Sequence, residues 1–97
     1  MDPKEYISVT EFCEYNHIQY SFINSLSEYG LLSVTIIEEN EYIDHEQVRE
    51  LEKMMRLHYD LEINLQGIDA INHLLNRVSE MQNEIRLLRN RLKRFEE

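Results

Sequence analysis

Histidine, cysteine and carboxylate side chains are the residues of this sequence that could bind a metal or perform acid–base chemistry. The four histidines and the single cysteine show no metal-site spacing with one another; they are His17, His45, His58, His73 and Cys13. No nucleophile, base and orienting acid can be argued at any spacing. The sequence therefore predicts no catalytic residue, no metal site and no bound cofactor, and a protein that is not an enzyme.

The charged residues are divided unevenly between the two halves of the chain. Residues 1–48 hold ten acids and one base, Lys4, whereas residues 49–97 hold nine acids and nine bases. An acidic surface repels the phosphates of nucleic acids and attracts basic protein surfaces. The acidic N-terminal half therefore indicates a basic protein as partner, and we expect no direct binding to nucleic acid.

The lack of long apolar segments and the single cysteine indicate the cellular compartment in which the protein is expected. No apolar run approaches the ~20 residues that a membrane helix needs, and the N-terminus lacks a signal-peptide pattern. One cysteine cannot form an internal disulfide, which fits a reducing compartment. We expect a cytoplasmic protein with no membrane partner, in which Cys13 is a buried structural thiol.

The first thirty residues predict two short helices around a tight turn. Ser8 and Glu11 form a capping-box pattern that should begin a helix over about residues 9–15. A second helix over about residues 19–28 should end before Gly30, which suits a left-handed stop. The side chains spaced to face inward are Val9, Phe12, Cys13, Phe22, Ile23 and Leu26.

A small hairpin and a linking helix should follow. Residues 33–38 are β-branched and predict a strand, with a turn at Glu39-Asn40 and a return strand over residues 41–43. A linking helix is expected over residues 45–60. Residues 1–62 are thus expected to form a winged helix-turn-helix-like domain that includes the linking helix.

The C-terminal third predicts one long helix with an apolar seam. Asn64 can cap this helix, which should run from about Leu65 to Phe95. Four consecutive heptads carry apolar residues, with Ile71, Val78, Ile85 and Leu92 at position a and Leu74, Met81, Leu88 and Phe95 at position d. We expect residues 63–97 to be a coiled-coil helix and these eight side chains to form a homodimer. The alternative is a helix that packs back on its own domain.

These predicted elements resemble the MerR-type architecture. The family often opens with the pattern I-x-E-L-A-x-x-x-G-V-S-x-R-T-L-R-Y-Y-E-x-x-G-L, which aligns without gaps from Glu11 to Gly30. Phe12, Ile18 and Ile23 occupy its apolar positions. The family's R-Y-Y, which usually contacts the DNA backbone, aligns with Asn24, Ser25 and Leu26. The Arg that precedes it in the family's turn aligns with Ser21, and the family's turn Gly aligns with His17. The resemblance implies a mostly α fold, a MerR-like winged helix-turn-helix with a small β-hairpin wing and a long C-terminal coiled-coil helix, without the usual phosphate contacts.

The C-terminal half is similar to the chaperone modulatory CbpM family. Residues 56–68 resemble its R-L-x-x-x-L-x-x-[D/N]-x-x-G-I segment, and residues 84–95 resemble its E-N-R-L-L-R-Q-R-L-x-x-F tail. Members bind the J-domain of a DnaJ-like co-chaperone of the CbpA type, and they inhibit its co-chaperone and DNA-binding activities. The resemblance implies the same role here, and the alternative is a MerR-like transcription regulator that binds DNA as a dimer.

If the partner is the basic J-domain helix that normally docks on DnaK, exposed acids and neighbouring tyrosines should bind it. The candidates are Glu11, Glu14, Glu28, Glu38, Glu39, Glu41, Tyr15, Tyr20 and Tyr42. The alternative for each acid is simple solvation. If the protein were a DNA-binding regulator, the basic residues available for phosphate contacts would be those of the terminal helix, namely Arg77, Arg86, Arg89, Arg91, Lys93 and Arg94.

Overall fold

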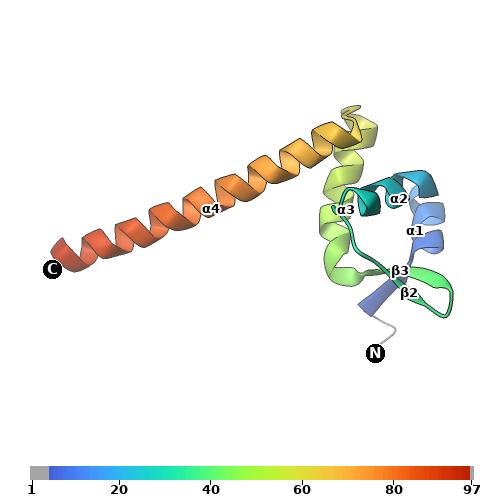
Figure 1. Cartoon of the computed structure of the whole chain (residues 1–97), viewed down its shortest axis with the longest axis horizontal. Helices are drawn as coiled ribbons and strands as arrows, with labels where there is room; N and C mark the ends of the chain where they lie inside the picture. The colour runs from blue at the N-terminus through green and yellow to red at the C-terminus, as the bar shows by residue number, and fades with distance from the viewer. Residues whose placement is uncertain (1–4, 97) are drawn as a thin grey trace.

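The computed structural model describes residues 5–96, a mostly helical chain with a small antiparallel sheet and one long C-terminal helix (Figure 1). Lys4 and the outermost ends of the two predicted domains lie outside these residues. The elements are β1 (Tyr6–Ser8), α1 (Val9–Asn16), α2 (Tyr20–Glu28), β2 (Val34–Ile37), β3 (Asn40–Asp44), α3 (Val48–Met55) and α4 (Leu65–Glu96). A 3₁₀ turn (His45–Gln47) precedes α3, and a π-helical turn (Arg56–Asp60) follows it.

Helices α1 and α2 form as their capping and periodicity predict. The Ser8 hydroxyl accepts a hydrogen bond from the Glu11 backbone N–H at 3.4 Å, which confirms the cap. His17 ends α1 in the left-handed conformation with φ 56°, and Gly30 follows α2 with φ 74°. All six side chains predicted to face inward are buried.

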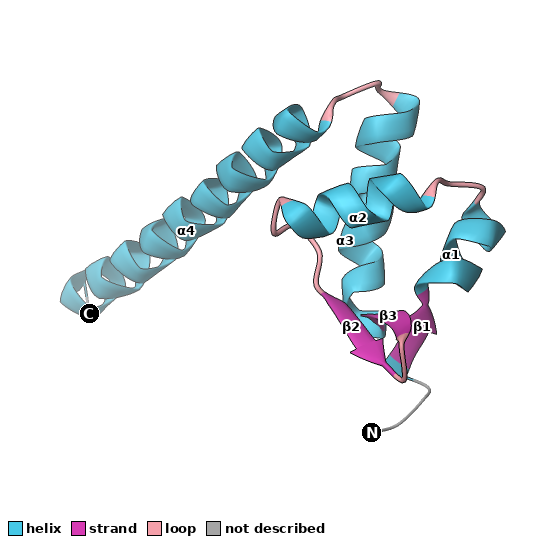
Figure 2. Ribbon diagram, turned by 45° about the vertical axis from the view of Figure 1, so that its right-hand side comes forward, coloured by secondary structure: helices cyan, strands magenta, loops and turns pink. Residues whose placement is uncertain are grey.

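The sheet has the order β1-β3-β2, with β3 in the middle (Figure 2). Two details of the sequence prediction were wrong. The hairpin turn consists of Glu38 and Glu39 rather than Glu39-Asn40, because Asn40 already pairs with Ile37 as the first residue of β3. Strand β1 was not predicted, since its pairing partner lies more than thirty residues away along the chain.

The core lies between the sheet, the two short helices and α3. Ile23, Leu26, Ile43 and Leu51 are fully buried there, and Ile68 of α4 completes the cluster. The predicted linking helix has the expected bounds, because residues 45–60 are helical throughout, but the segment is a 3₁₀ turn, an α-helix and a π turn in succession rather than one regular α-helix.

A ring stack and two backbone contacts accompany the π turn. The His58 ring stacks on Phe22 with a centroid distance of 4.7 Å, and its Nδ1 lies 3.0 Å from the Ile63 carbonyl oxygen. The Leu61 N–H donates to the Arg56 carbonyl, five residues back. Single π turns of this kind are rare, and they occur frequently at functional sites.

Helix α4 begins at the predicted cap and then leaves the domain. The Asn64 side chain accepts a hydrogen bond from the Gly67 N–H at 2.8 Å. From His73 onward every described residue of α4 is exposed, and the molecule measures 58 × 36 × 20 Å. Figures 1 and 2 both show α4 projecting from the domain, so the alternative of a helix folded back on its own domain is not what the structure has.

Candidate protein-binding surfaces

The first candidate surface is the end of the hairpin beside the start of α2. The Tyr20 hydroxyl donates to the Glu41 carboxylate, with oxygen–oxygen distances of 2.7 and 2.8 Å. This hydrogen bond raises the pKa of Tyr20 above its ordinary value of 10.0, and partial desolvation adds to the shift. Two predicted candidates are thereby held together, and the contact ties the hairpin to α2.

The two turn residues of the hairpin both have positive φ, at 50° for Glu38 and 68° for Glu39. A two-residue hairpin turn with this sign at both positions normally contains Asn or Gly, because a side chain with a Cβ is strained there. Both glutamates are exposed. The hairpin tip therefore presents two adjacent acids on a backbone that suits other residues better.

The other predicted candidates do not join this end of the molecule. Glu28 closes α2 two helical turns beyond Tyr20 and accepts a hydrogen bond from Asn24. Tyr42 follows Glu41 along β3, so its side chain lies on the opposite face of the sheet. Glu11, Glu14 and Tyr15 are all exposed on α1, with Tyr15 at 85%. The nine predicted residues thus form one linked pair, one strained turn and several separate positions.

Ile36 is a surface residue that the sequence reasoning missed. It pairs with Glu41 in the hairpin, on the face that also carries Val34 and Ile43. Val34 and Ile43 pack on the core, whereas Ile36 lies beyond it and is 70% exposed. The alternation of Val34 and Ile36 was the available signal, since residues two apart on a strand share a face. An apolar side chain therefore lies next to the hairpin acids.

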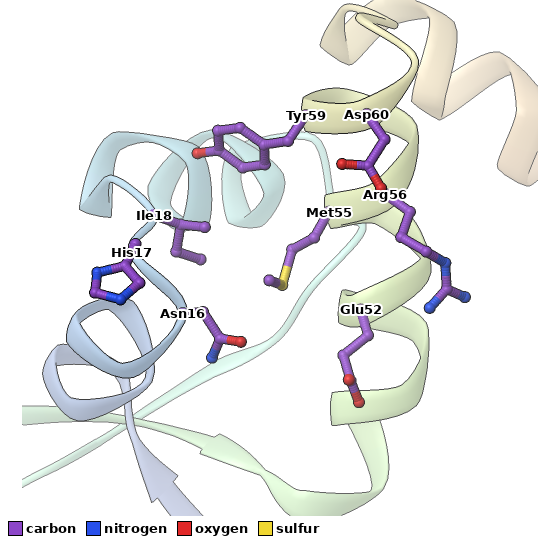
Figure 3. Close-up of a pocket in the computed structure, with 8 residues that line it drawn as sticks. All are labelled: Asn16, His17, Ile18, Glu52, Met55, Arg56, Tyr59 and Asp60. Atoms are coloured by element: carbon purple, nitrogen blue, oxygen red, sulfur yellow. The ribbon is translucent and has the colours of Figure 1, made fainter.

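A second candidate surface is a groove between the α1–α2 turn and the α3 side of the domain (Figure 3). Its volume is about 360 Å³, and its lining consists of Asn16, His17, Ile18, Glu52, Met55, Arg56, Tyr59 and Asp60. Figure 3 shows Ile18, Met55 and Tyr59 pointing toward the space between the two walls. Tyr59 also packs edge-on against Phe22, at 5.3 Å between ring centroids. None of these residues was predicted as a binding residue; the sequence analysis named His17 only as a side chain without metal-site spacing and as the residue at the family's turn glycine.

A third candidate surface is the apolar seam of α4. Ile71 is half-buried, and the other seven predicted seam residues are exposed, with Phe95 at 89%. The heptad spacing places all eight on one face of the continuous helix. Within residues 5–96 nothing covers this face beyond its first turn, so it is free to contact another molecule.

The described part of the chain offers little support for metal binding or for a reactive cysteine. No group of three or more histidine, cysteine, aspartate or glutamate side chains among residues 5–96 could hold a metal ion. Cys13 is buried, as predicted, and its burial raises the pKa of the thiol above the ordinary 9.0. None of the described helices is long and apolar enough to cross a membrane.

Comparison with known proteins identifies the family. The family model for MerR HTH family regulatory proteins matches residues 7–90, which is most of the chain. The chain belongs to this family. Among curated proteins it is similar to the chaperone modulatory protein CbpM of Escherichia coli O1:K1 and of Escherichia coli strain UTI89. Each is 29% identical over 90 residues, covering 91% of this chain and 88% of the relative.

The resemblance to the chaperone modulatory proteins that the sequence indicated is thus confirmed. No solved structure gives a significant match. Within this MerR-family chain, the positions where a DNA-gripping R-Y-Y would stand are an exposed Asn24, a half-buried Ser25 and a buried Leu26. Residues 5–48 contain no lysine or arginine at all.

Proposed function

We propose that this protein is a non-enzymatic chaperone modulator. In this proposal it binds the J-domain of a DnaJ-like co-chaperone of the CbpA type and inhibits that co-chaperone's chaperone and DNA-binding activities. The observation that carries the proposal is the likeness to proteins named chaperone modulatory protein CbpM over 91% of the chain. The absence of basic residues from positions 5–48 supports it, because DNA affinity depends on lysine and arginine contacts to phosphate.

The proposed mechanism is charge complementarity on a winged helix-turn-helix frame. Residues 5–64 hold thirteen acids and three bases, a net charge of −10. A basic J-domain helix approaching this domain would be steered by that field, and the steering raises the association rate more than the final affinity. Covering the basic helix would keep it from its chaperone partner and from DNA, which accounts for both inhibitory effects.

Within the domain we assign the first contact to the hairpin end. Glu38 and Glu39 form its tip, Glu41 is fixed by the Tyr20 hydroxyl, and Ile36 adds an apolar side chain beside them. The hydrogen bond to Tyr20 holds the Glu41 carboxylate in place before binding, which lowers the entropy lost on association. The strained turn conformation is retained at this spot although Asn-Gly would relieve it, as is typical of functional loops.

The test is a charge reversal with a charge-matched control. The triple variant Glu38→Lys, Glu39→Lys and Glu41→Lys should slow association with an isolated J-domain at least tenfold at low salt and lose most of the salt dependence. The control is the triple variant Glu46→Lys, Glu50→Lys and Glu62→Lys, which makes the same change in net charge on exposed residues away from the hairpin tip.

The measurement is surface plasmon resonance or stopped-flow fluorescence at two salt concentrations. The control should retain most of the wild-type rate, because only the general field is reduced. Equal slowing in both triple variants would show that net charge alone steers the partner and that the hairpin is not the contact. No binding of any J-domain to the wild-type protein would reject the proposed function.

The runner-up is a transcription regulator, which the family description as regulatory proteins favours. It predicts duplex binding that weakens steeply as salt rises. We expect no such binding at physiological salt, because α2 offers Asn24 and Ser25 where phosphate contacts are needed. A gel shift with random and with curved duplexes tests this, and micromolar affinity would favour the regulator instead.

We also propose that the protein is a homodimer through α4. The proposal is supported by eight apolar side chains in consecutive heptads, of which seven are exposed in the single chain. Monomeric soluble proteins seldom leave a continuous apolar stripe of this kind facing water.

A further inference from the structure

The outer edge of β2 is a row of backbone groups without a neighbouring strand. Strand β2 lies at one side of the three-stranded sheet, and β3 is the only strand that pairs with it in the described part of the chain (Figure 2). An edge strand presents N–H and C=O groups that can pair with another chain. Several protein families bind extended segments in this way, by adding them to a sheet as a further strand.

The register of the hairpin determines which backbone groups of β2 face outward. A two-residue turn is flanked by a hydrogen-bonded pair, and here that pair is Ile37 and Asn40. Hydrogen-bonded and non-hydrogen-bonded pairs alternate along an antiparallel ladder, so Thr35 also bonds to β3, whereas Ile36 and Val34 do not. The N–H and C=O groups of Ile36 and Val34 therefore point away from β3, toward the free edge.

The fold protects the backbone beside this edge but not the edge itself. The Gln47 side chain donates to the Ser33 carbonyl oxygen at 2.9 Å and accepts from the Ser33 N–H at 2.8 Å, so it takes the place of a strand there. No turn, loop or side-chain hydrogen bond among residues 5–96 reaches Val34 or Ile36. The Ile36 side chain is also 70% exposed. The edge thus combines free backbone groups with an uncovered apolar side chain.

The charges around the edge indicate which kind of chain would pair with it. β2 reads Val-Thr-Ile-Ile and has none of the lysines or prolines that often keep edge strands from pairing. Glu38 and Glu39 follow it directly, and Glu41 lies opposite Ile36. Two copies joined at this edge would bring together two domains of net charge −10, and the repulsion disfavours self-pairing. A basic segment would instead be attracted.

We propose that the β2 edge binds an extended protein segment in which basic and apolar residues alternate, by adding that segment to the sheet as a fourth strand. Its backbone would bond to the outward groups of Val34 and Ile36, its apolar side chains would cover Ile36, and its basic side chains would lie near the hairpin acids. A helix cannot make this contact, because its backbone groups already bond within the helix. The site is therefore additional to the J-domain helix of the proposed function.

The first test uses synthetic peptides and amide hydrogen exchange. A peptide of alternating valine and lysine should bind and, at saturation, slow exchange of the Val34 and Ile36 N–H groups about tenfold or more, because both become hydrogen-bonded. The same peptide with every backbone nitrogen methylated keeps its side chains and charge but has no donors, and it should bind about tenfold more weakly or worse. A peptide of alternating valine and glutamate should not bind. Equal affinity of the methylated peptide, or binding of the glutamate peptide, would overturn the proposal.

The second test removes one donor from the edge. Ile36→Pro deletes the outward N–H and leaves the ladder to β3 intact, because an edge strand tolerates proline where its nitrogen faces solvent. We expect it to weaken binding of the valine–lysine peptide about tenfold. Ile36→Ala is the control, since it removes more of the apolar side chain but retains the N–H, and it should bind more tightly than Ile36→Pro. Circular dichroism checks the fold of both variants, and equal affinities would contradict a strand-type contact.

A second copy of the chain is the competing occupant of the edge. Protection of the Val34 and Ile36 N–H groups that grows with protein concentration in the absence of peptide would assign the edge to self-pairing and overturn the proposal. Protection that appears only with the valine–lysine peptide supports it. Because the probe is a peptide and not a J-domain, a negative result here leaves the proposed function standing, and failure of J-domain binding leaves the peptide result standing.

Discussion

Glu38 and Glu39 hold a backbone conformation that costs about 1–2 kcal/mol per residue for most side chains. No hydrogen bond or ion pair within residues 5–96 uses either carboxylate. A turn of this type would be more stable with Asn-Gly. The two acids thus add no side-chain contact to the hairpin itself, which agrees with the proposed role of the hairpin end as a contact for a basic partner.

We therefore predict opposite effects on stability and binding for one double substitution. Glu38→Asn with Glu39→Gly should raise the free energy of unfolding by about 1 kcal/mol, because the positive φ angles are no longer strained. The same variant should associate more slowly with the J-domain. Thermal unfolding and binding kinetics measure the two effects. Glu41→Gln is the control, since Glu41 is in extended β3 and offers no relief of strain; an unchanged melting temperature in the double variant would contradict the turn analysis.

A pH effect follows from the hydrogen bond between Tyr20 and Glu41. Because the pKa of Tyr20 is higher in the folded protein than its ordinary 10.0, its contribution to stability is present below pH 10 and is lost as the pH rises through the folded-state pKa. Tyr20→Phe should remove this part of the alkaline fall in stability. Chemical unfolding of wild-type and variant protein from pH 8 to pH 11 measures it, and parallel curves for the two proteins would show that the bond is not formed in solution.

At the scale of elements, the start of α4 depends on Asn64. Its side-chain oxygen accepts from the Gly67 N–H at 2.8 Å, and the first turn of α4 leads directly into the buried Ile68. Asn64→Ala should lower the free energy of unfolding by about 1 kcal/mol, and Asn64→Ser should restore most of that loss because serine also caps helices well. Denaturant unfolding compares the three proteins; equal stability of the alanine and serine variants would show that capping is not the cause.

A substitution of Gly67 by alanine would have two opposing effects on stability, a gain in helix propensity and a steric contact. Alanine is the better helix former by about 1 kcal/mol, but a Cβ at this position would lie 2.7 Å from Ile63 Cγ2 and 3.2 Å from the capping oxygen of Asn64. Ile63 packs on the core, so it cannot move away freely. We expect the contact to outweigh the propensity, and Gly67→Ala to be destabilising in the same unfolding assay. A more stable Gly67→Ala protein would mean that Ile63 rotates without loss.

The elements that were predicted correctly are those with local signals. The Ser8 cap, the spacing of Phe22, Ile23 and Leu26, and the Asn64 cap all depend on residues within a few positions of each other. β1 was missed because three residues paired with a distant strand leave no periodic pattern. The π turn was missed because its accompanying contacts, the stacking of His58 on Phe22 and the approach of its ring to Ile63, are tertiary.

The candidate surfaces divide in the same way. The seam could be read directly, since heptads are a property of one continuous helix. The pairing of Tyr20 with Glu41 joins residues 21 positions apart, and the exposure of Ile36 depends on where the core ends. The pairing therefore could not be predicted, although Tyr20 and Glu41 were each named for their chemistry. The alternation of Val34 and Ile36 indicates that they share a face, but it does not indicate that Ile36 is exposed.

For the whole molecule, the seam predicts a clear change in assembly. Val78→Asp with Ile85→Asp should convert the proposed dimer to a monomer, because each Asp would face an apolar layer of the partner helix. Both positions are about half exposed in the single chain, so the globular domain should keep its stability. Light scattering gives the mass and circular dichroism checks the fold. A wild-type mass of one chain at tens of micromolar would refute the dimer.

The length of α4 has a further consequence once two copies are joined. A helix of 32 residues at about 1.5 Å per residue is a stiff rod of about 48 Å. In the proposed homodimer this rod would hold two hairpin ends at a fixed separation and would make the assembly a bivalent ligand. A co-chaperone that is itself dimeric, with J-domains at a matching distance, would be held by avidity, which raises overall affinity by roughly 10²–10⁴ without a new contact. Adding or removing a heptad would change that span, so the length of α4 would determine which dimeric partners the proposed homodimer can hold at both ends.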